Sequence, residues 1–357
     1  MFKNKTQKII SIFSLTIIIV IGIYSFLVGP VSKDRTLKRI DITNGASYLT
    51  IAPLLKENKL IRSSFFYKIY IKSHKPKPID ACSYYLSENM GVKKIVKILS
   101  TSCKGDPSAI RITFKEGINI RQMAKLIASK TNNSEDSVYE LLKDNDYLDE
   151  LIEKYWFLTN EIKNEDIFYP LEGYLFPNTY EFANKDVEIK SIFEKMLKET
   201  DKQLKPFKET IENSEFSLHE FLTLVSIVEL ESSDCNDRAG IAQVFYNRLR
   251  DNWPLGSDVT TYYGLQKEMS EYVLTKKELN EYNAYNTRCV KMKTLPIGPI
   301  CNSGINAILA TLNPKEHNNY YFAADKNGKT YFTVSEKEHN QVIKELKEED
   351  LWFVPKN

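Results

Sequence analysis

The sequence has few residues arranged to hold a metal ion or a nucleotide. Its 4 histidines are scattered, and it contains neither an H-E-x-x-H segment nor a C-x-x-C pair. A P-loop, a G-x-G-x-x-G turn after a predicted strand and a G-x-S-x-G elbow are missing too. We therefore expect no metal and no cofactor, which leaves reactions that carboxylate side chains can perform.

A clear excess of either charge is also missing. The chain has 49 Lys and Arg residues against 47 Asp and Glu residues, which gives a formal net charge of +2. Proteins that bind phosphate backbones normally carry a clustered basic excess, so we expect no nucleic acid partner. Hydrophobic residues make up 42% of the 357 positions, enough to form cores in about two or three domains.

A long run without charges is present near the N-terminus. Residues 9–28, IISIFSLTIIIVIGIYSFLV, are long enough to cross the hydrocarbon core of a bilayer as one helix. Lys3, Lys5 and Lys8 precede this run without an acidic residue, and such a flank tends to stay in the cytoplasm. The run is long for a signal peptide, and no small-x-small cleavage site follows it. We expect a single-pass anchor, with residues 1–8 in the cytoplasm and the rest of the chain outside.

The 5 cysteines are an odd number for an exported protein. Cys82 and Cys103 would form a pair within one predicted module, but the sequence does not fix which cysteines pair. Buried free thiols are an alternative for these two residues and for Cys235, Cys289 and Cys301.

Two stretches in the first half of the chain repeat each other. Gly45 and Gly117 each precede apolar residues at offsets of 6, 7, 9 and 10. These residues are Ile51, Ala52, Leu54 and Leu55 after the first glycine, and Met123, Ala124, Leu126 and Ile127 after the second. Both stretches predict a strand, a glycine turn and a short amphipathic helix.

We therefore predict small α+β modules in residues 29–112 and, together with a helical linker, in residues 113–165. The modules resemble LysM domains, which bind glycan. Any β-turn-helix unit that packs in the same way would show a similar repeat, so both interpretations stay open.

Residues 166–357 predict a larger α+β domain, so the expected fold class is α+β throughout. An aromatic-rich segment, FYPLEGYLFPNTYEF, precedes predicted helices near 187–200, around 222–231 and over RAGIAQVFYNRLR. Near the end, YYFAAD and KTYFTV flank Asn327-Gly328, which is a strong signal for a β-hairpin.

Residues 222–234, LTLVSIVELESSD, form an apolar run that ends in acidic residues. On a helix, Leu222, Val225 and Ser226 share one side with Glu229, because neighbours three and four positions apart stack. A carboxyl packed against apolar surface has a raised pKa and can donate a proton near neutral pH, as a glycosidic general acid does. Alternatively, the apolar run ends one turn earlier and Glu229 faces water. The helix alone leaves both interpretations open.

Ordinary glycoside hydrolysis uses a second carboxylate across the sugar ring. Glu231, Asp234 and Asp258 are the obvious candidates, and the sequence marks none of them as the partner. The segments after Glu229 are rich in amide, hydroxyl and aromatic side chains, which suit a glycan groove and well-ordered loops equally. The candidate substrate-binding residues are Glu231, Asn247, Asp258, Thr260, Tyr263, Asn286 and Asn340.

Five segments in order carry a resemblance to a known family: LEGYLFPNTYEF, LVSIVELESSD, VFYNRLRDNWPLGSDVTTYYGL, YNTRCVKMKTLPIGPICNSGINAILATLNP and YYFAADKNGKTYFTVSEKEHN. From the anchor to the C-terminus, most of the chain resembles the YceG/MltG-type endolytic murein transglycosylases of bacterial membranes. The resemblance implies that Glu229 is the catalytic residue, and that an anchor and LysM-like modules precede a catalytic domain at 166–357. Val259, Ile297, Ser303 and Thr330 depart from the family pattern and leave the glutamate untouched.

The resemblance also implies the reaction. A lytic transglycosylase needs one acid, which protonates the glycosidic oxygen between MurNAc and GlcNAc and then takes the proton of the C6 hydroxyl. A 1,6-anhydro-MurNAc end forms without water. We expect the protein to cut peptidoglycan strands at the bacterial inner membrane, to end the elongation of nascent strands and to meet peptidoglycan synthases there.

Two other functions stay open. One is a glycan-binding scaffold of the cell-wall synthesis machinery, in which the last domain is inert. The other is a muramidase that uses water, with Asp258 or Glu231 as the second carboxylate.

Overall fold

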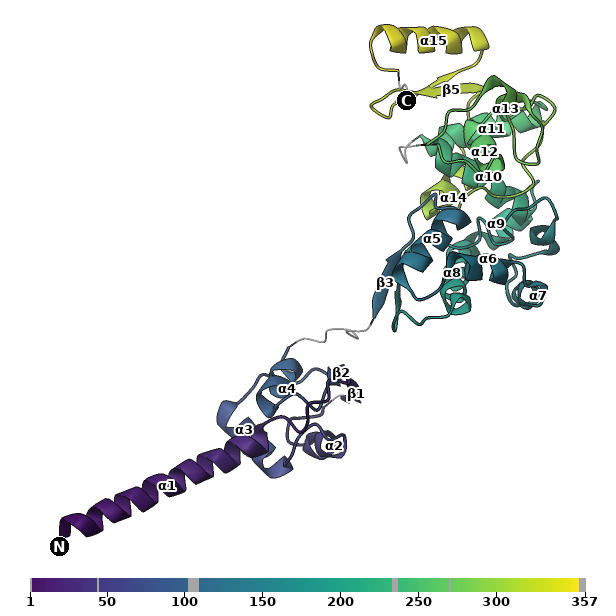
Figure 1. The fold of residues 1–357 in the computed structure, drawn as a ribbon. Helices are drawn as coiled ribbons and strands as arrows, with labels where there is room; N and C mark the ends of the chain where they lie inside the picture. The colour runs from purple at the N-terminus through teal and green to yellow at the C-terminus, as the bar shows by residue number, and fades with distance from the viewer. Residues whose placement is uncertain (1, 44, 102–108, 233–236, 270, 353–357) are drawn as a thin grey trace. The chain divides into compact units, whose positions relative to one another are not determined.

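A computed structural model describes residues 2–43, 45–101, 109–232, 237–269 and 271–352, with mixed α and β structure (Figure 1). The chain divides into two compact units, Met1–Ala109 and Ile110–Asn357. Each unit is described by itself below. The mixture confirms the predicted α+β class.

The first unit starts with the long apolar helix. Its elements are α1 (Phe2–Val28), β1 (Lys38–Asp41), α2 (Ala52–Glu57), α3 (Ser64–His74), β2 (Ser83–Leu86) and α4 (Val92–Leu99). Within α1, Ile9–Val28 has a mean hydropathy of 2.5 and is long and apolar enough to cross a membrane. The helix is therefore compatible with a single-pass anchor.

The predicted repeat of a glycine turn and a short helix is confirmed. Gly45 and Gly117 both have positive φ, +83° and +78°, a backbone conformation that favours glycine. The helices α2 and α5 follow them, and the apolar residues at offsets of 6, 7 and 10 are buried in both. In the first unit, β1 pairs with β2 in antiparallel register, with Ile40 opposite Tyr84.

The second module begins the second unit. Its elements are β3 (Ile110–Thr113), α5 (Ile120–Lys130), α6 (Glu135–Leu142), α7 (Asn145–Lys154) and the 3-10 helix η1 (Asn160–Lys163). The strand β3 pairs in antiparallel register with β4 (Thr179–Phe182), with Ile112 opposite Tyr180. Since β4 belongs to the aromatic-rich segment, this sheet crosses the predicted boundary at 165/166. The domain boundaries and the likeness to LysM stay predictions.

The rest of the second unit is mostly helical. It contains α8 (Ile189–Leu204), η2 (Lys205–Phe207), α9 (Lys208–Glu212), α10 (Leu218–Glu231), α11 (Arg238–Arg250), α12 (Asp258–Gly264), α13 (Lys276–Asn280), α14 (Ile305–Leu312), β5 (Tyr321–Ala324), β6 (Thr330–Thr333) and α15 (Glu336–Glu348). The predicted hairpin is confirmed, because β5 and β6 pair antiparallel around Gly328, whose φ is +85°.

Helix α10 lies at the centre of the second unit and packs against α9, α11, α12 and α14 (Figure 1). Its first turn has a capping box, in which the Ser217 hydroxyl accepts from the N–H of Glu220 and the Glu220 carboxylate accepts from the N–H of Ser217. Every residue from Phe221 to Glu229 is buried. The sequence predicts one apolar face, whereas the helix is enclosed on all sides because other helices cover it.

Glu172, in the aromatic-rich segment, is a carboxylate that joins three parts of the second unit. Its side chain accepts hydrogen bonds from the N–H of Ile120 (3.0 Å), the hydroxyl of Tyr263 (3.0 Å) and the amide of Asn302 (2.9 Å). Burial raises the pKa of Glu172 to about 8, while these donors favour its ionised form. A buried polar group without partners is costly, so the network holds the turn between β3 and α5 against α12 and the segment before α14.

Asn302 extends this network to the backbone. Its side chain accepts from the N–H of Leu175 (2.9 Å) and donates to the carbonyl of Ile118 (3.1 Å). Its own N–H donates to the carbonyl of Ile118 (2.8 Å), and its carbonyl accepts from the N–H of Gly117 (2.9 Å). The isolated antiparallel bridge between Ile118 and Asn302 therefore fixes the β3–α5 turn beside residues 302–304.

Candidate active site

Glu229 lies in the last turn of α10, and its side chain is enclosed. The residue is 5% exposed. The N–H of Gly304, immediately before α14, donates to Oε2 of Glu229 at 2.8 Å. The guanidinium of Arg238, in the first turn of α11, donates to Oε1 at 2.5 Å and forms a buried ion pair. Two elements that follow α10 in the chain thus supply the polar partners of this carboxyl.

Burial is the largest influence on the pKa of Glu229, and it raises that pKa above the usual value. The N–H of Gly304 and the charge of Arg238 lower it, and the charge of Glu116 raises it. Because the net direction is upward, Glu229 keeps a proton at a pH where an exposed glutamate has lost it. A carboxyl in this state can act as a general acid.

The prediction that Glu229 is buried is confirmed, and the interpretation in which it faces water is wrong. The prediction of an apolar surface around the carboxyl needs a correction. The stem of Glu229 belongs to the buried helix, but its two oxygens meet a cation and a backbone N–H. Sequence reasoning missed Arg238, Gly304 and Glu116. These residues lie on other elements, and the periodicity of one helix does not identify the residues that contact it from elsewhere in the chain.

The β3–α5 turn lies directly against the last turn of α10. A Cβ added to Gly117 would lie 3.2 Å from Cδ2 of Leu230 and 3.8 Å from Cγ of Glu229. Two cavities, of about 70 Å³ and about 390 Å³, share Gly117 and Gln122 in their linings. Leu230 also lines the first and Glu116 the second, so the first cavity adjoins the last turn of α10 and the second adjoins the β3–α5 turn.

A polar cavity of about 370 Å³ brings three of the predicted substrate-binding residues together: Glu231, Asp258 and Asn340. Glu231 accepts a hydrogen bond from the hydroxyl of Ser257. Burial raises the pKa of Glu231 to about 6, and the charge of Asp258 adds to the rise. Two positions along a helix are about 200° apart, so Glu231 leaves α10 on the side opposite to Glu229.

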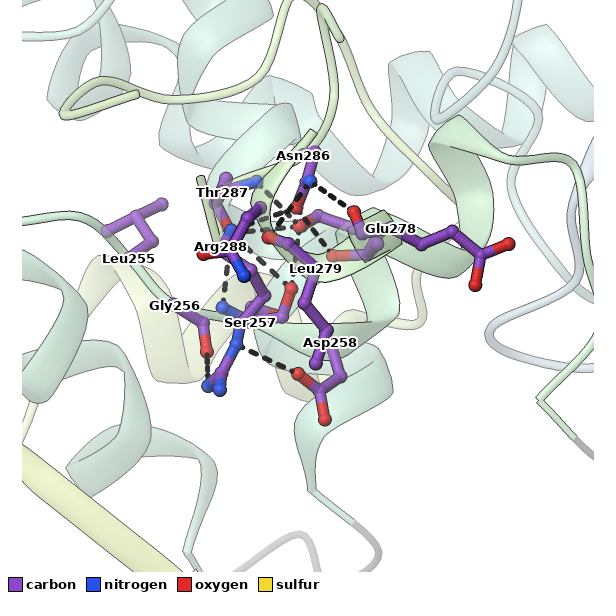
Figure 2. A network of polar contacts seen from close by, with 12 residues as sticks. Leu255, Gly256, Ser257, Asp258, Glu278, Leu279, Asn286, Thr287 and Arg288 are labelled. Carbon is purple, nitrogen blue, oxygen red and sulfur yellow. Dashed lines mark hydrogen bonds and ion pairs between the residues drawn. The ribbon is translucent and has the colours of Figure 1, made fainter. Parts of the chain in front are cut away.

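Asp258 lies at the exposed rim of this polar cavity. Arg288 forms an ion pair with Asp258 at 3.2 Å and donates to the carbonyl of Gly256 at 3.0 Å. Figure 2 shows the Arg288 side chain extended between these two groups. The pair is solvated, so it contributes little to stability and leaves Asp258 open to other partners.

Asn286 is fully buried, and both the nitrogen and the oxygen of its amide form hydrogen bonds within the protein (Figure 2). Its nitrogen donates to the carbonyls of Glu278 (3.0 Å) and Glu281 (2.7 Å), and its oxygen accepts from the hydroxyl of Thr261 (2.6 Å). These contacts support a structural role in holding the loop after α13. Contact between Asn286 and the substrate stays a prediction.

The same holds for three other predicted substrate-binding residues, Asn247, Thr260 and Tyr263, which are all buried. Asn247 donates to the carbonyls of His317 (2.8 Å) and Asn319 (3.0 Å). Thr260 donates to the carbonyl of Ser257 at 2.7 Å, and Tyr263 donates to Glu172. Their side chains connect parts of the fold, and a role in binding substrate stays a prediction.

Within the part of the chain that the structure describes, no group of three or more His, Cys, Asp or Glu side chains is placed to hold a metal ion. Cys289 and Cys301 are buried free thiols. Cys103, Cys235 and Asp234 lie outside the described residues. The pairing of Cys82 with Cys103 and the candidacy of Asp234 therefore stay predictions.

Residues 40–345 match the model of the YceG-like family. The chain belongs to this family. It is 35% identical over 318 residues to the endolytic murein transglycosylase of Bacillus subtilis strain 168, covering 88% of this chain and 86% of that one. The endolytic murein transglycosylase of Streptococcus pneumoniae serotype 2 is 28% identical over 331 residues, covering 88% of this chain and 59% of that one.

A crystal structure of a yceG-like protein from Listeria monocytogenes is also similar. It aligns with a TM-score of 0.62 at 32% identity, and the match covers 87% of this chain and all of that one. The resemblance seen in the sequence is therefore confirmed at the level of the family.

The two repeated glycines form a matched pair for testing the contact at the site. Gly45→Ala and Gly117→Ala each place a side chain at positive φ, which costs about 1–2 kcal/mol of stability. Only the Cβ at position 117 meets Leu230 and Glu229, whereas nothing lies within 4 Å of a Cβ at position 45. We expect Gly117→Ala to lower the rate of murein cleavage by about tenfold or more, because the added Cβ crowds Leu230 beside the acid and strains the turn, and Gly45→Ala to retain the rate.

The measurement is the initial cleavage rate of the two purified full-length variants, together with their melting temperatures. Equal loss of activity in both would contradict a direct contact between the β3–α5 turn and the site.

Proposed function

We propose that the protein is a membrane-anchored endolytic murein transglycosylase. It cleaves the bond between MurNAc and GlcNAc in peptidoglycan strands and leaves 1,6-anhydro-MurNAc ends. The observation that carries the proposal is the buried carboxyl of Glu229 at the end of α10, with a raised pKa and two hydrogen-bond donors. The relatives from Bacillus and Streptococcus, which are named endolytic murein transglycosylases, support the same reaction.

In the first step, Glu229 donates its proton to the glycosidic oxygen. The bond from C1 of MurNAc to that oxygen breaks, and the leaving sugar keeps the proton as a hydroxyl group. Electron deficiency develops at C1, and Glu229 becomes a carboxylate. Arg238 and the N–H of Gly304 are already in place to stabilise this negative charge, so little reorganisation accompanies the proton transfer.

In the second step, the Glu229 carboxylate accepts the proton of the C6 hydroxyl on the same MurNAc. O6 forms a bond to C1 and closes the anhydro ring. The acid returns to its protonated form and water is not consumed. Because the substrate carries its own nucleophile, positioning replaces the water-activating base of a hydrolase.

A muramidase that uses water is the second candidate, and the raised pKa of Glu231 in a polar cavity with Asp258 is the observation in its favour. Its second carboxylate would have to face Glu229 across one sugar ring. Glu231 leaves α10 on the opposite side, which favours the transglycosylase. The relatives named endolytic murein transglycosylases favour an enzyme over a glycan-binding scaffold.

The proposed location is the bacterial inner membrane, with α1 as a single-pass anchor and residues 1–8 in the cytoplasm. There the enzyme would meet nascent glycan strands and the synthases that make them. The apolar surface of α1 and the lysines before it support this orientation.

Glu229→Gln tests the proposed acid. Glutamine keeps the shape of the side chain but cannot donate the proton, so formation of anhydro ends should fall by a factor on the order of 100 or more. Glutamine fills the same space but takes the ion-pair partner from Arg238, so the melting temperature is measured to separate loss of stability from loss of the acid. Glu231→Gln is the matched control, because it removes a carboxyl from the other side of α10 and should matter less.

The products identify the reaction. In water enriched in heavy oxygen, mass spectrometry of wild-type digests should show new muramic ends that are one water lighter than hydrolysed ends and carry no label. Reducing ends that contain solvent oxygen would contradict the transglycosylase and favour the muramidase. A Glu229→Gln variant with full activity and normal melting would move the proton donor elsewhere.

The orientation in the membrane has its own test. Protease added to spheroplasts should digest the chain after residue 28, while a tag placed before Lys3 should stay intact until the membrane is lysed. A large fragment that survives until lysis would show the reverse orientation.

A further inference from the structure

The turn between β3 and α5 carries a second carboxylate, that of Glu116. The N–H of Gly117 donates to the carbonyl of Asn302 (2.9 Å) and the N–H of Asn302 donates to the carbonyl of Ile118 (2.8 Å), so Gly117 and Ile118 both lie opposite Asn302, as in a β-bulge. The N–H of Ile118 also donates to the carbonyl of Lys115 (3.2 Å), which closes a tight turn with Glu116 and Gly117 at its centre. These backbone hydrogen bonds hold the turn that carries Glu116 beside residues 302–304.

Glu116 and Glu229 both lie against Gly304. A Cβ on Gly304 would collide with the carboxyl end of Glu116, because that group occupies the space where a side chain would begin. The N–H of the same glycine donates to Oε2 of Glu229 at 2.8 Å. One residue without a side chain thus separates the two carboxyl groups.

The two carboxyl groups have different surroundings. Glu229 is buried, whereas Glu116 is exposed and lines the cavity of about 390 Å³ beside the turn. The buried carboxyl of Glu229 loses the hydration that favours its ionised form, and the nearby charge of Glu116 adds repulsion. Paired acids whose environments differ in this way take different roles.

We infer that Glu116 is a positioning residue for the proposed transglycosylase reaction, whose fixed negative charge acts on Glu229 across Gly304. Its position in the β3–α5 turn makes the second module part of the active site. The inference rests on the proposed function, because it assigns Glu116 to the same acid.

Charges of both signs act on Glu229 in addition to its burial. In the described residues, the titratable groups that interact with Glu229 are Arg238 from α11, Glu116 from the β3–α5 turn and the buried thiol of Cys301 before α14. Arg238 favours the ionised form of Glu229, which has no proton to donate in the first step. Burial is the largest influence that keeps the proton on Glu229, and Glu116 adds to it by opposing Arg238, which remains a donor for the charge formed in the first step.

Glu116→Gln removes the charge and preserves the shape. Activity requires protonated Glu229, so it declines as pH rises through the pKa of that group. Loss of the Glu116 charge lowers this pKa, and the basic limb of the pH–rate profile should move to lower pH. At neutral pH the rate of anhydro-end formation should fall roughly tenfold, mainly in kcat.

Two further variants of the full-length protein complete the test. Glu116→Asp keeps the charge and should retain the basic limb near its wild-type position. Glu150→Gln removes an exposed carboxylate from α7 in the same unit and should match the wild type throughout. The melting temperatures of all variants separate loss of folding from loss of activity.

A Glu116→Gln enzyme whose basic limb coincides with that of the wild type would overturn the inference, whatever its rate. The inference would also be overturned if Glu116→Asp moved the basic limb as far as Glu116→Gln does. If the wild type itself forms no anhydro ends, the proposed function fails and the inference fails with it. This result is distinguishable from failure of the inference alone, in which the wild type forms anhydro ends normally.

Discussion

The burial of one carboxyl group at the end of α10 is the constraint on which the site depends. Removing an acid from water favours its protonated form, and a protonated acid is what the first step of glycoside cleavage requires. The same burial would make the carboxylate that follows costly. Arg238 and the N–H of Gly304 offset this cost, so the site accommodates both states of Glu229.

These donors are held by the packing of the second unit. Helix α10 is enclosed by α11, α12 and α14, which places the start of α11 and the residue before α14 beside its last turn. The hydrogen bonds of Glu172 and Asn302 hold the β3–α5 turn, which contacts the last turn of α10. The second module therefore contributes directly to the site.

Local features of the fold could be predicted from the sequence. The glycine turns at Gly45 and Gly117 follow from offsets within ten residues, and the hairpin at Gly328 follows from a dipeptide between two apolar runs. The period of α10 allows a buried Glu229 without deciding it, because the helices that enclose α10 come from other parts of the chain. For the glycine turns and the hairpin, the determining interactions lie within a few residues of the chain.

Contacts between distant segments could not be predicted in this way. Asn302 and Ile118 are 184 positions apart, and the sequence carries no local sign that they meet. The amide and hydroxyl side chains of Asn247, Thr260 and Asn286 are ambiguous in the sequence for a different reason, since the same chemical groups hold loops together and bind sugars. The family resemblance supplied the reaction, and the structure supplied the partners of the acid.

The protonation state of Glu229 in the substrate-free protein is the most direct test of this account. Infrared difference spectra between the wild type and Glu229→Gln isolate this carboxyl, because its protonated and ionised forms absorb at separate frequencies. Burial outweighs the Arg238 ion pair in this account, so the band of the protonated carboxyl should persist above pH 4.5, the ordinary pKa of glutamate. Disappearance of that band at or below pH 4.5 would show that the ion pair dominates, and would contradict Glu229 as the proton donor.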